Sequence, residues 1–188
     1  MTWNEYLTLS EKTLSTEFHI ADDLFYQKIL HAVIGSLTEV EEILDNYDGT
    51  NLTTSVEKQG SLGEECADVF WYLAILFREL DVKQLPTYNF DSENPFNLLM
   101  DFTKTGLKFL DLLKKKIYYN KSIDSEVLSN LSLTMYNQMV AYCVLYKIDV
   151  EVILDKNIQK LRSRYGDKFS SEKAINRDLD VEKRILES

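Results

Sequence analysis

Two pairs of acidic residues at helical spacing are the side chains of this sequence best suited to chemistry. Glu65 and Asp68 stand in "GEECADVFWYLAILF", just ahead of nine consecutive apolar residues, and Glu39 and Glu42 stand in "HAVIGSLTEVEEILD". Residues three apart on a helix share a face, with Cβ atoms about 5–6 Å apart. Because burying unpaired carboxylates is costly, we expect cations wherever these faces pack against another element.

Two antiparallel helices joined by a loop would bring the two pairs face to face. Carboxylates are hard oxygen donors, which suit Mg²⁺ or Mn²⁺ rather than zinc. Di-iron bundles use Glu-x-x-His pairs, but the residues three after these pairs are Asp45 and Trp71. The sequence therefore predicts a Mg²⁺ site, in which Mn²⁺ can substitute, with the ligands Glu39, Glu42, Glu65 and Asp68. For the first pair alone, an ordinary solvated face is the alternative.

Gly35 and His31 share the helical face of the first acidic pair. A glycine inside a helix costs about 1 kcal/mol relative to alanine, so Gly35 predicts the close approach of another group. His31 is a candidate for contact with a bound nucleotide, and a polar core residue is the alternative. Tyr72 and its two aromatic neighbours could stack on a base, but aromatic residues on such a helix belong more often to the core.

A basic counterpart stands near the end of the chain, in "NIQKLRSRYGDKF". Lys160 and Arg164 are four apart on one helical face, and Asn157 precedes them on the same face. Two interpretations are open. The cations could simply favour a helix C-terminus, or they could hold phosphate groups opposite the metal. The sequence contains no glycine-rich phosphate loop that would do this work instead.

The elements that must position these residues are all predicted to be helices. The chain has six glycines and two prolines in 188 residues, and no segment alternates convincingly like a strand. A charged tail from residue 170 is also expected to be helical. The predicted helices span residues 3–14, 21–46, 62–80, 96–119, 125–147 and 150–165.

A faint internal repeat predicts how these helices are arranged. The segment "WYLAILFRELDVKQL" aligns with "MVAYCVLYKIDVEVI", which starts 68 residues later. We therefore expect an all-α bundle of two helix–loop–helix halves. Leu133 and Tyr136 align with the second acidic pair, so only the first half carries the acidic metal site. The single predicted domain, residues 1–188, comprises a first half at 20–82, a second at 95–165 and a tail at 166–188.

The composition argues against several classes of partner. The net charge of −10 disfavours binding to nucleic acid or to anionic lipid. The longest apolar run has nine residues, whereas a membrane helix needs roughly 20. No secretory signal is visible at the start, and the two cysteines stand in apolar surroundings. We therefore expect a cytoplasmic protein with buried, reduced cysteines.

Three motifs in order resemble the MazG-like all-α nucleoside triphosphate pyrophosphohydrolases, relatives of the dimeric dUTPases. They are "HAVIGSLTEVEE", "SLGEECADVFWYLA" and "NIQKLRSRYGDKFSSEKAINRDLDVEKR", and the resemblance covers about residues 20–82 and 150–184. It implies Mg²⁺-dependent hydrolysis of a (d)NTP to the monophosphate and pyrophosphate. It also implies a homodimer.

The resemblance assigns a role to each candidate residue. The metal ligands would be the four acids of the two pairs. Catalysis would rest on Glu39, Glu64 and Glu65, with Glu64 or Glu39 accepting a proton from water. Lys160 and Arg164 would bind the triphosphate, and Asn157 would lie near the nucleotide. The alternatives are a strict dUTP pyrophosphatase, a catalytically idle nucleotide or metal sensor, and a structural four-helix bundle used for assembly.

Overall fold

The computed structural model describes residues 1–45, 56–83, 94–166, 170–176 and 179–187. These residues form eight α-helices and no strand, as the sequence predicts. The helices are α1 (Trp3–Glu11), α2 (Leu24–Asp45), α3 (Val56–Glu79), α4 (Pro95–Tyr119), α5 (Ser125–Leu145), α6 (Val150–Tyr165), α7 (Ser171–Ile175) and α8 (Leu179–Glu187).

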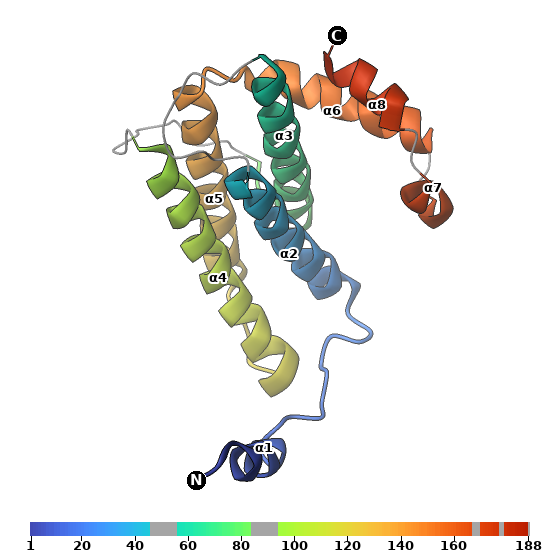
Figure 1. The fold of residues 1–188 in the computed structure, drawn as a ribbon. Coiled ribbons are helices and arrows are strands. Elements are labelled where there is room, and N and C mark those ends of the chain that lie inside the picture. Colours follow the sequence, from blue (N-terminus) through green and yellow to red (C-terminus); the bar gives the residue numbers. More distant parts are fainter. Residues whose placement is uncertain (46–55, 84–93, 167–169, 177–178, 188) are drawn as a thin grey trace.

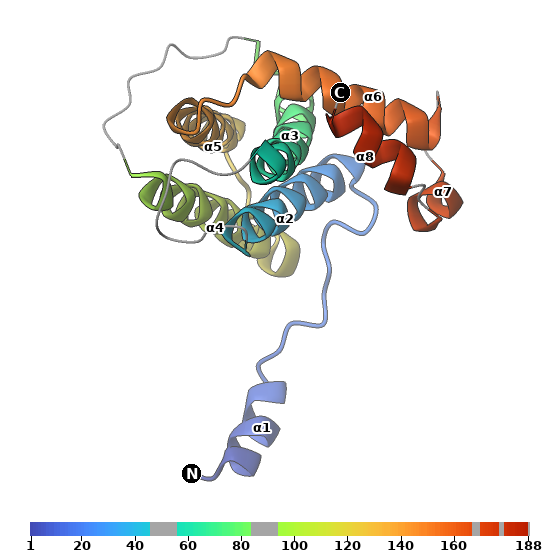
Figure 2. The same cartoon turned by 45° about the horizontal axis from the view of Figure 1, so that its top comes forward.

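Four of these helices form a bundle, which Figure 1 shows from the side. α2 packs along α3 and α4 packs along α5, so each half of the predicted repeat contains a pair of packed helices. The halves join through contacts of α2 with α4 and of α3 with α5. The prediction of an all-α bundle with two halves is confirmed. In Figure 2, α6 lies across the end of α3, and α8 lies beside α6.

The core lies between the four bundle helices. On α4, the fully buried Leu99, Phe102, Phe109 and Leu113 recur at helical spacing. Each large apolar side chain buried in this way contributes about 1.5–3 kcal/mol to stability. The two cysteines, Cys66 and Cys143, are fully buried, as expected.

Short polar residues fix several helix ends. The Asn94 side chain accepts a hydrogen bond from the backbone N–H of Asn97, and Pro95 occupies the first turn of α4. Asn120 ends α4 in the left-handed conformation, with φ at 49°. The Asp149 side chain caps α6 by accepting from two backbone N–H groups of its first turn. These caps place the start of α6, which carries the basic residues.

Two helix starts differ from the prediction. α2 begins at Leu24 rather than 21, because Asp23 accepts a hydrogen bond from the backbone N–H of Tyr26 and so caps the helix instead of belonging to its first turn. α3 begins at Val56, six residues before the predicted start. The polar stretch Glu57–Gln59 suggested a loop, yet glutamate, lysine and glutamine are good helix formers.

The other differences of more than one residue are at the end of α5, which is Leu145 rather than 147, and at the two ends of the chain. α1 ends at Glu11, three residues early, and the expected tail helix consists of the separate helices α7 and α8. Most of the residues between the predicted helices 21–46 and 62–80, and between 62–80 and 96–119, lie outside the described residues. None of the described helices is both long and apolar enough to cross a membrane.

We expect Phe102→Ala to lower the free energy of unfolding by about 3–5 kcal/mol, because it opens a cavity in the core. Phe102 is fully buried, whereas Tyr119 on the same helix is 67% exposed. Urea denaturation should therefore show a change within about 0.5 kcal/mol for the control variant Tyr119→Ala. Equal effects of the two variants would contradict the position of the core.

Candidate functional site

The packing of α2 against α3 brings three of the four predicted metal ligands together. Carboxylate oxygens of Glu39, Glu42 and Glu65 all lie within 4.8 Å of one another. Glu39 and Glu65 are half-buried, and Glu42 is exposed. Three convergent carboxylates with access to solvent on one side are a donor set that suits Mg²⁺ or Mn²⁺. We call these three residues the carboxylate cluster.

Without a cation, the acids of the carboxylate cluster are partly buried and repel one another. Burial, together with the neighbouring charges of Glu42 and Glu64, raises the pKa of Glu65 to about 8. Burial also raises the pKa of Glu39 to about 7, together with the charges of Asp68 and Glu42. A divalent ion would relieve both the burial cost and the repulsion.

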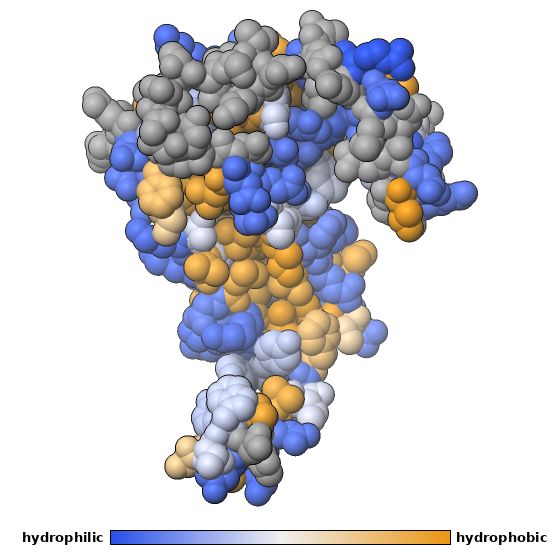
Figure 3. Space-filling model, viewed as in Figure 1, coloured by the Kyte–Doolittle hydropathy of each residue, from blue (hydrophilic) through white to orange (hydrophobic). Residues whose placement is uncertain are grey.

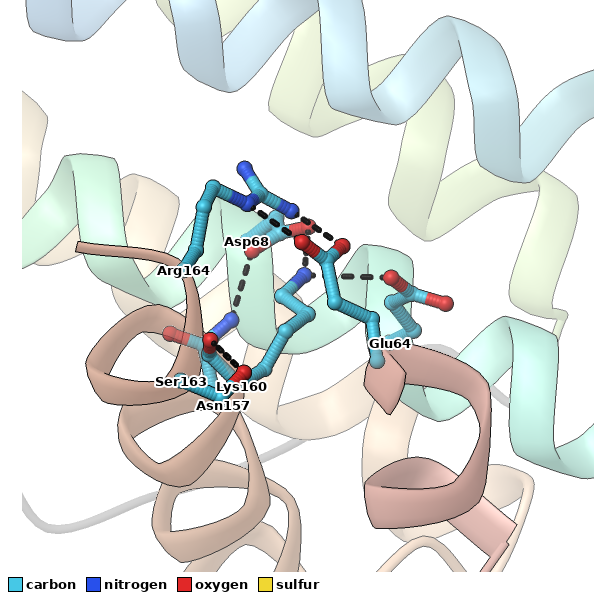
Figure 4. Close-up of polar contacts among 7 residues, drawn as sticks. Glu64, Asp68, Asn157, Lys160, Ser163 and Arg164 are labelled. Carbon is cyan, nitrogen blue, oxygen red and sulfur yellow. Dashed lines mark hydrogen bonds and ion pairs between the residues drawn. The ribbon is translucent and has the colours of Figure 1, made fainter. Parts of the chain in front are cut away.

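Asp68, the fourth predicted ligand, is held by α6. Its Oδ2 lies 2.7 Å from Nζ of Lys160, and its Oδ1 accepts a hydrogen bond of 2.5 Å from Nδ2 of Asn157. The same Nζ lies 3.1 Å from Oε1 of Glu64. Figure 4 shows this arrangement, in which the ammonium group lies between two carboxylates of α3. The structure thus brings α6 to the acidic face of α3.

Lys160 is the most deeply buried charge in this group, with 1% of the residue exposed. Burial alone would lower the pKa of its ammonium group, but the carboxylates of Asp68 and Glu64 more than offset this, and the pKa is raised. The side chain therefore stays charged at neutral pH. An ammonium buried between two carboxylates orients them both, because moving either one away would remove one of its two counter-charges.

Arg164 is paired with Glu182, a residue of α8 for which the sequence predicted no role. Its Nε and one terminal nitrogen donate hydrogen bonds of 2.7 and 2.6 Å to the two oxygens of the Glu182 carboxylate. This bidentate pair raises the pKa of Arg164 further above its already high ordinary value. Glu182 is 4% exposed. The apolar residues Val181 and Ile185 are four apart, which is typical of a helix that packs on another element. Nothing in the sequence indicated that Arg164 is the partner of Glu182.

Gly35 has the close neighbour that the sequence predicts. A Cβ atom added there would lie 2.2 Å from Cε1 of Tyr72, so the tyrosine ring of α3 covers the glycine of α2. The His31 ring meets the Tyr72 ring edge-on, with centroids 5.5 Å apart. Burial and the charges of Glu39 and Asp68 raise the pKa of the Tyr72 hydroxyl. Tyr72 therefore belongs to the surroundings of the acids, and His31 contacts Tyr72.

Comparison with protein-family models, with curated proteins and with solved structures finds no match to this chain. The function is therefore inferred from the arrangement of the residues described above.

We expect the metal-free protein to lose stability as the pH rises from about 5.5 to 8. The pKa values of Glu39 and Glu65, about 7 and about 8, lie above the ordinary value of 4.5. The folded protein thus binds more protons than the unfolded chain in this window, and the stabilisation is lost as the pH passes through 7 and 8. After allowance for solvent screening, the loss should be about 1–2 kcal/mol.

Urea denaturation in EDTA at several pH values would measure this slope. Glu65→Gln should flatten it, because the amide does not titrate. Glu41→Gln is the matched control, since Glu41 is an exposed acid of α2 outside the carboxylate cluster, and it should keep the slope of the wild type. A wild-type stability that is constant or rises across the window would contradict the electrostatics of the site.

Proposed function

We propose that this protein is a Mg²⁺-dependent nucleoside triphosphate pyrophosphohydrolase, which converts a (d)NTP to the monophosphate and pyrophosphate. The observation that carries this proposal is the convergence of Glu39, Glu42 and Glu65 on one point of the α2–α3 interface. Lys160 of α6 pairs with Glu64 and Asp68, the acids on either side of Glu65 along α3. The resemblance of three sequence motifs to the MazG-like enzymes supports the same reaction.

The carboxylate cluster would hold the metal, and Asp68 can join it. A carboxylate oxygen has two lone pairs, so Asp68 can keep its bonds to Lys160 and Asn157 and still ligate a cation. When bound, Mg²⁺ supplies charge neutralisation for the phosphates and a more acidic water as nucleophile. A chain with net charge −10 repels a triphosphate, and a bound metal ion would offset this repulsion at the site.

A carboxylate of α3 or α2 would accept the proton, and Arg164 of α6 would stabilise the leaving group. Glu64 or Glu39 accepts a proton from the attacking water. The water oxygen forms a bond to the α-phosphorus while the bond from that phosphorus to the α,β-bridging oxygen breaks. Pyrophosphate leaves with its new charge near Arg164. Lys160 fixes the direction of Glu64 and Asp68 throughout.

The test of this proposal is pyrophosphate release from a panel of (d)NTPs with Mg²⁺, Mn²⁺ or EDTA. We expect metal-dependent release that falls at least about 100-fold in Glu65→Gln, equivalent to a loss of roughly 3 kcal/mol of transition-state stabilisation. Circular dichroism should show an unchanged helix content in this variant. Glu41→Gln, the exposed neighbour on α2, should keep the wild-type rate.

The other functions give different results in the same assay. Release from dUTP alone would identify a strict dUTP pyrophosphatase. Metal binding without release from any nucleotide would indicate a sensor. If Glu65→Gln turned over at the wild-type rate, the carboxylate cluster would not be the catalytic centre.

The pairing of Arg164 with Glu182 leads to a second prediction. If Arg164 binds the triphosphate, the substrate must replace a carboxylate that already makes two hydrogen bonds to it. Glu182→Gln removes the competing charge and keeps the shape of the side chain. We expect KM to fall about 5-fold with little change in kcat, which corresponds to about 1 kcal/mol. A higher KM would show that Glu182 positions Arg164 for the substrate instead of competing with it.

A further inference from the structure

α1 projects away from the bundle and exposes an apolar face. Figures 1 and 2 show it beyond the end of α4, and it packs along none of the other helices that the structure describes. Trp3 is 69% exposed, Tyr6 52% and Leu7 48%. These three residues lie on one side of the helix, and the rings of Trp3 and Tyr6 stack with centroids 5.6 Å apart. We call them the α1 face.

The segment that carries α1 is fixed to the bundle. The backbone N–H of His19 donates a hydrogen bond of 2.9 Å to the carbonyl of Ile117, and the Ser15 hydroxyl donates one of 3.2 Å to the carbonyl of Tyr118. The Phe18 ring meets the Tyr118 ring edge-on. The segment that follows α1 is therefore attached to the C-terminal end of α4, and α1 extends from this attachment.

A helix as short as α1 needs a packing partner. It has nine residues, whereas isolated helices shorter than about 12–15 residues are marginal in water. Thr2 and Glu5 form a capping box that favours its start, but a cap alone adds only about 1 kcal/mol. The partner must cover the α1 face, and no described helix of this chain does so.

A matching apolar surface lies on the side of the bundle formed by α2 and α4. Ile34 on α2 is 46% exposed and Leu107 on α4 is 55% exposed. Figure 3 shows an apolar area over these two helices on the face turned to the viewer. Half-buried leucines on the same faces extend it, and α2 and α4 approach closely where Leu37 meets Gly106. We define the α2–α4 patch as Leu30, Ile34, Leu37, Leu107 and Leu110.

The charges of α1 and α4 are complementary. α1 carries Glu5 and Glu11 and no basic residue, so its side chains sum to −2. α4 carries five lysines and two aspartates, which sum to +3 in a chain of net charge −10. Lys104 and Lys108 stand on either side of Leu107 in the sequence, at the border of the patch. A second copy of the chain therefore offers α1 both an apolar surface and opposite charge.

We propose that two copies of this chain form a dimer in which the α1 face of each packs on the α2–α4 patch of the other. The exchange is reciprocal, as two-fold symmetry requires, so both α1 helices gain a partner and both patches are covered. α1 points away from its own bundle, which favours the patch of a second copy over that of its own chain. The proposal is independent of the proposed catalytic activity.

Sedimentation of the full chain over a range of concentrations tests the dimer. The wild type should have about twice the chain mass of 21.9 kDa. Trp3→Ser on α1 and Leu107→Asp on the patch should each raise the dissociation constant at least about 30-fold. Val144→Asp is the matched control, because Val144 on α5 is also 55% exposed but lies outside the patch, and it should stay dimeric. A monomeric wild type, or dimers unaffected by both variants, would overturn the proposal.

Cross-linking identifies the surfaces in contact. Cys66 and Cys143 are fully buried, so introduced cysteines provide the accessible thiols. A Leu7→Cys protein mixed with a Leu107→Cys protein should give a covalent heterodimer with a short bis-maleimide. Each protein alone should give little product. Efficient linkage of Leu7→Cys to itself would mean that the α1 helices pair with each other, which would overturn the assignment of the patch.

Discussion

The burial of Lys160 between Asp68 and Glu64 is the interaction on which the architecture around the site depends. Removing one partner of a buried ion pair typically costs several kcal/mol, because the other charge is left without compensation. The pair therefore fixes α6 on α3 in one register. That register places Arg164 one turn further along, where α8 packs on α6. The ammonium group of Lys160 thus holds α6 on α3 directly, and α8 in turn packs on α6. A metal bound to the carboxylate cluster would interact with the same group of acids.

The bundle and its two halves could be predicted because they depend on local sequence. Long helical periods and few glycines or prolines indicated the helices, and the faint repeat indicated their pairing. The helix starts were predicted less well. Asp23 could be either a cap or a first-turn residue, and only the backbone conformation distinguishes these. The separation of α1 from the bundle also had no signal, because the spacing of its apolar residues is that of any packed helix.

The sequence predicts the parts of the candidate site that depend on spacing within one helix. It does not predict the contacts between segments that lie far apart along the chain. Spacing placed Glu39 and Glu42 on one face, and Gly35 correctly predicted a close neighbour, which is Tyr72. Spacing could not show that Asp68 is bound by Lys160 and Asn157, which lie about 90 residues away along the chain. Nor could it show that Glu182 reaches Arg164, because that contact depends on where α8 packs.

The early start of α3 changes the electrostatics of its acids. A helix that began near residue 62 would have placed Glu64 and Glu65 in its first turn, where the positive end of the peptide dipoles favours negative charge. With the start at Val56, both residues lie in the third turn, and the dipole effect fades within the first. The backbone therefore does little to offset their repulsion. The compensation must come from outside the helix, and at Glu64 it comes from the ammonium group of α6.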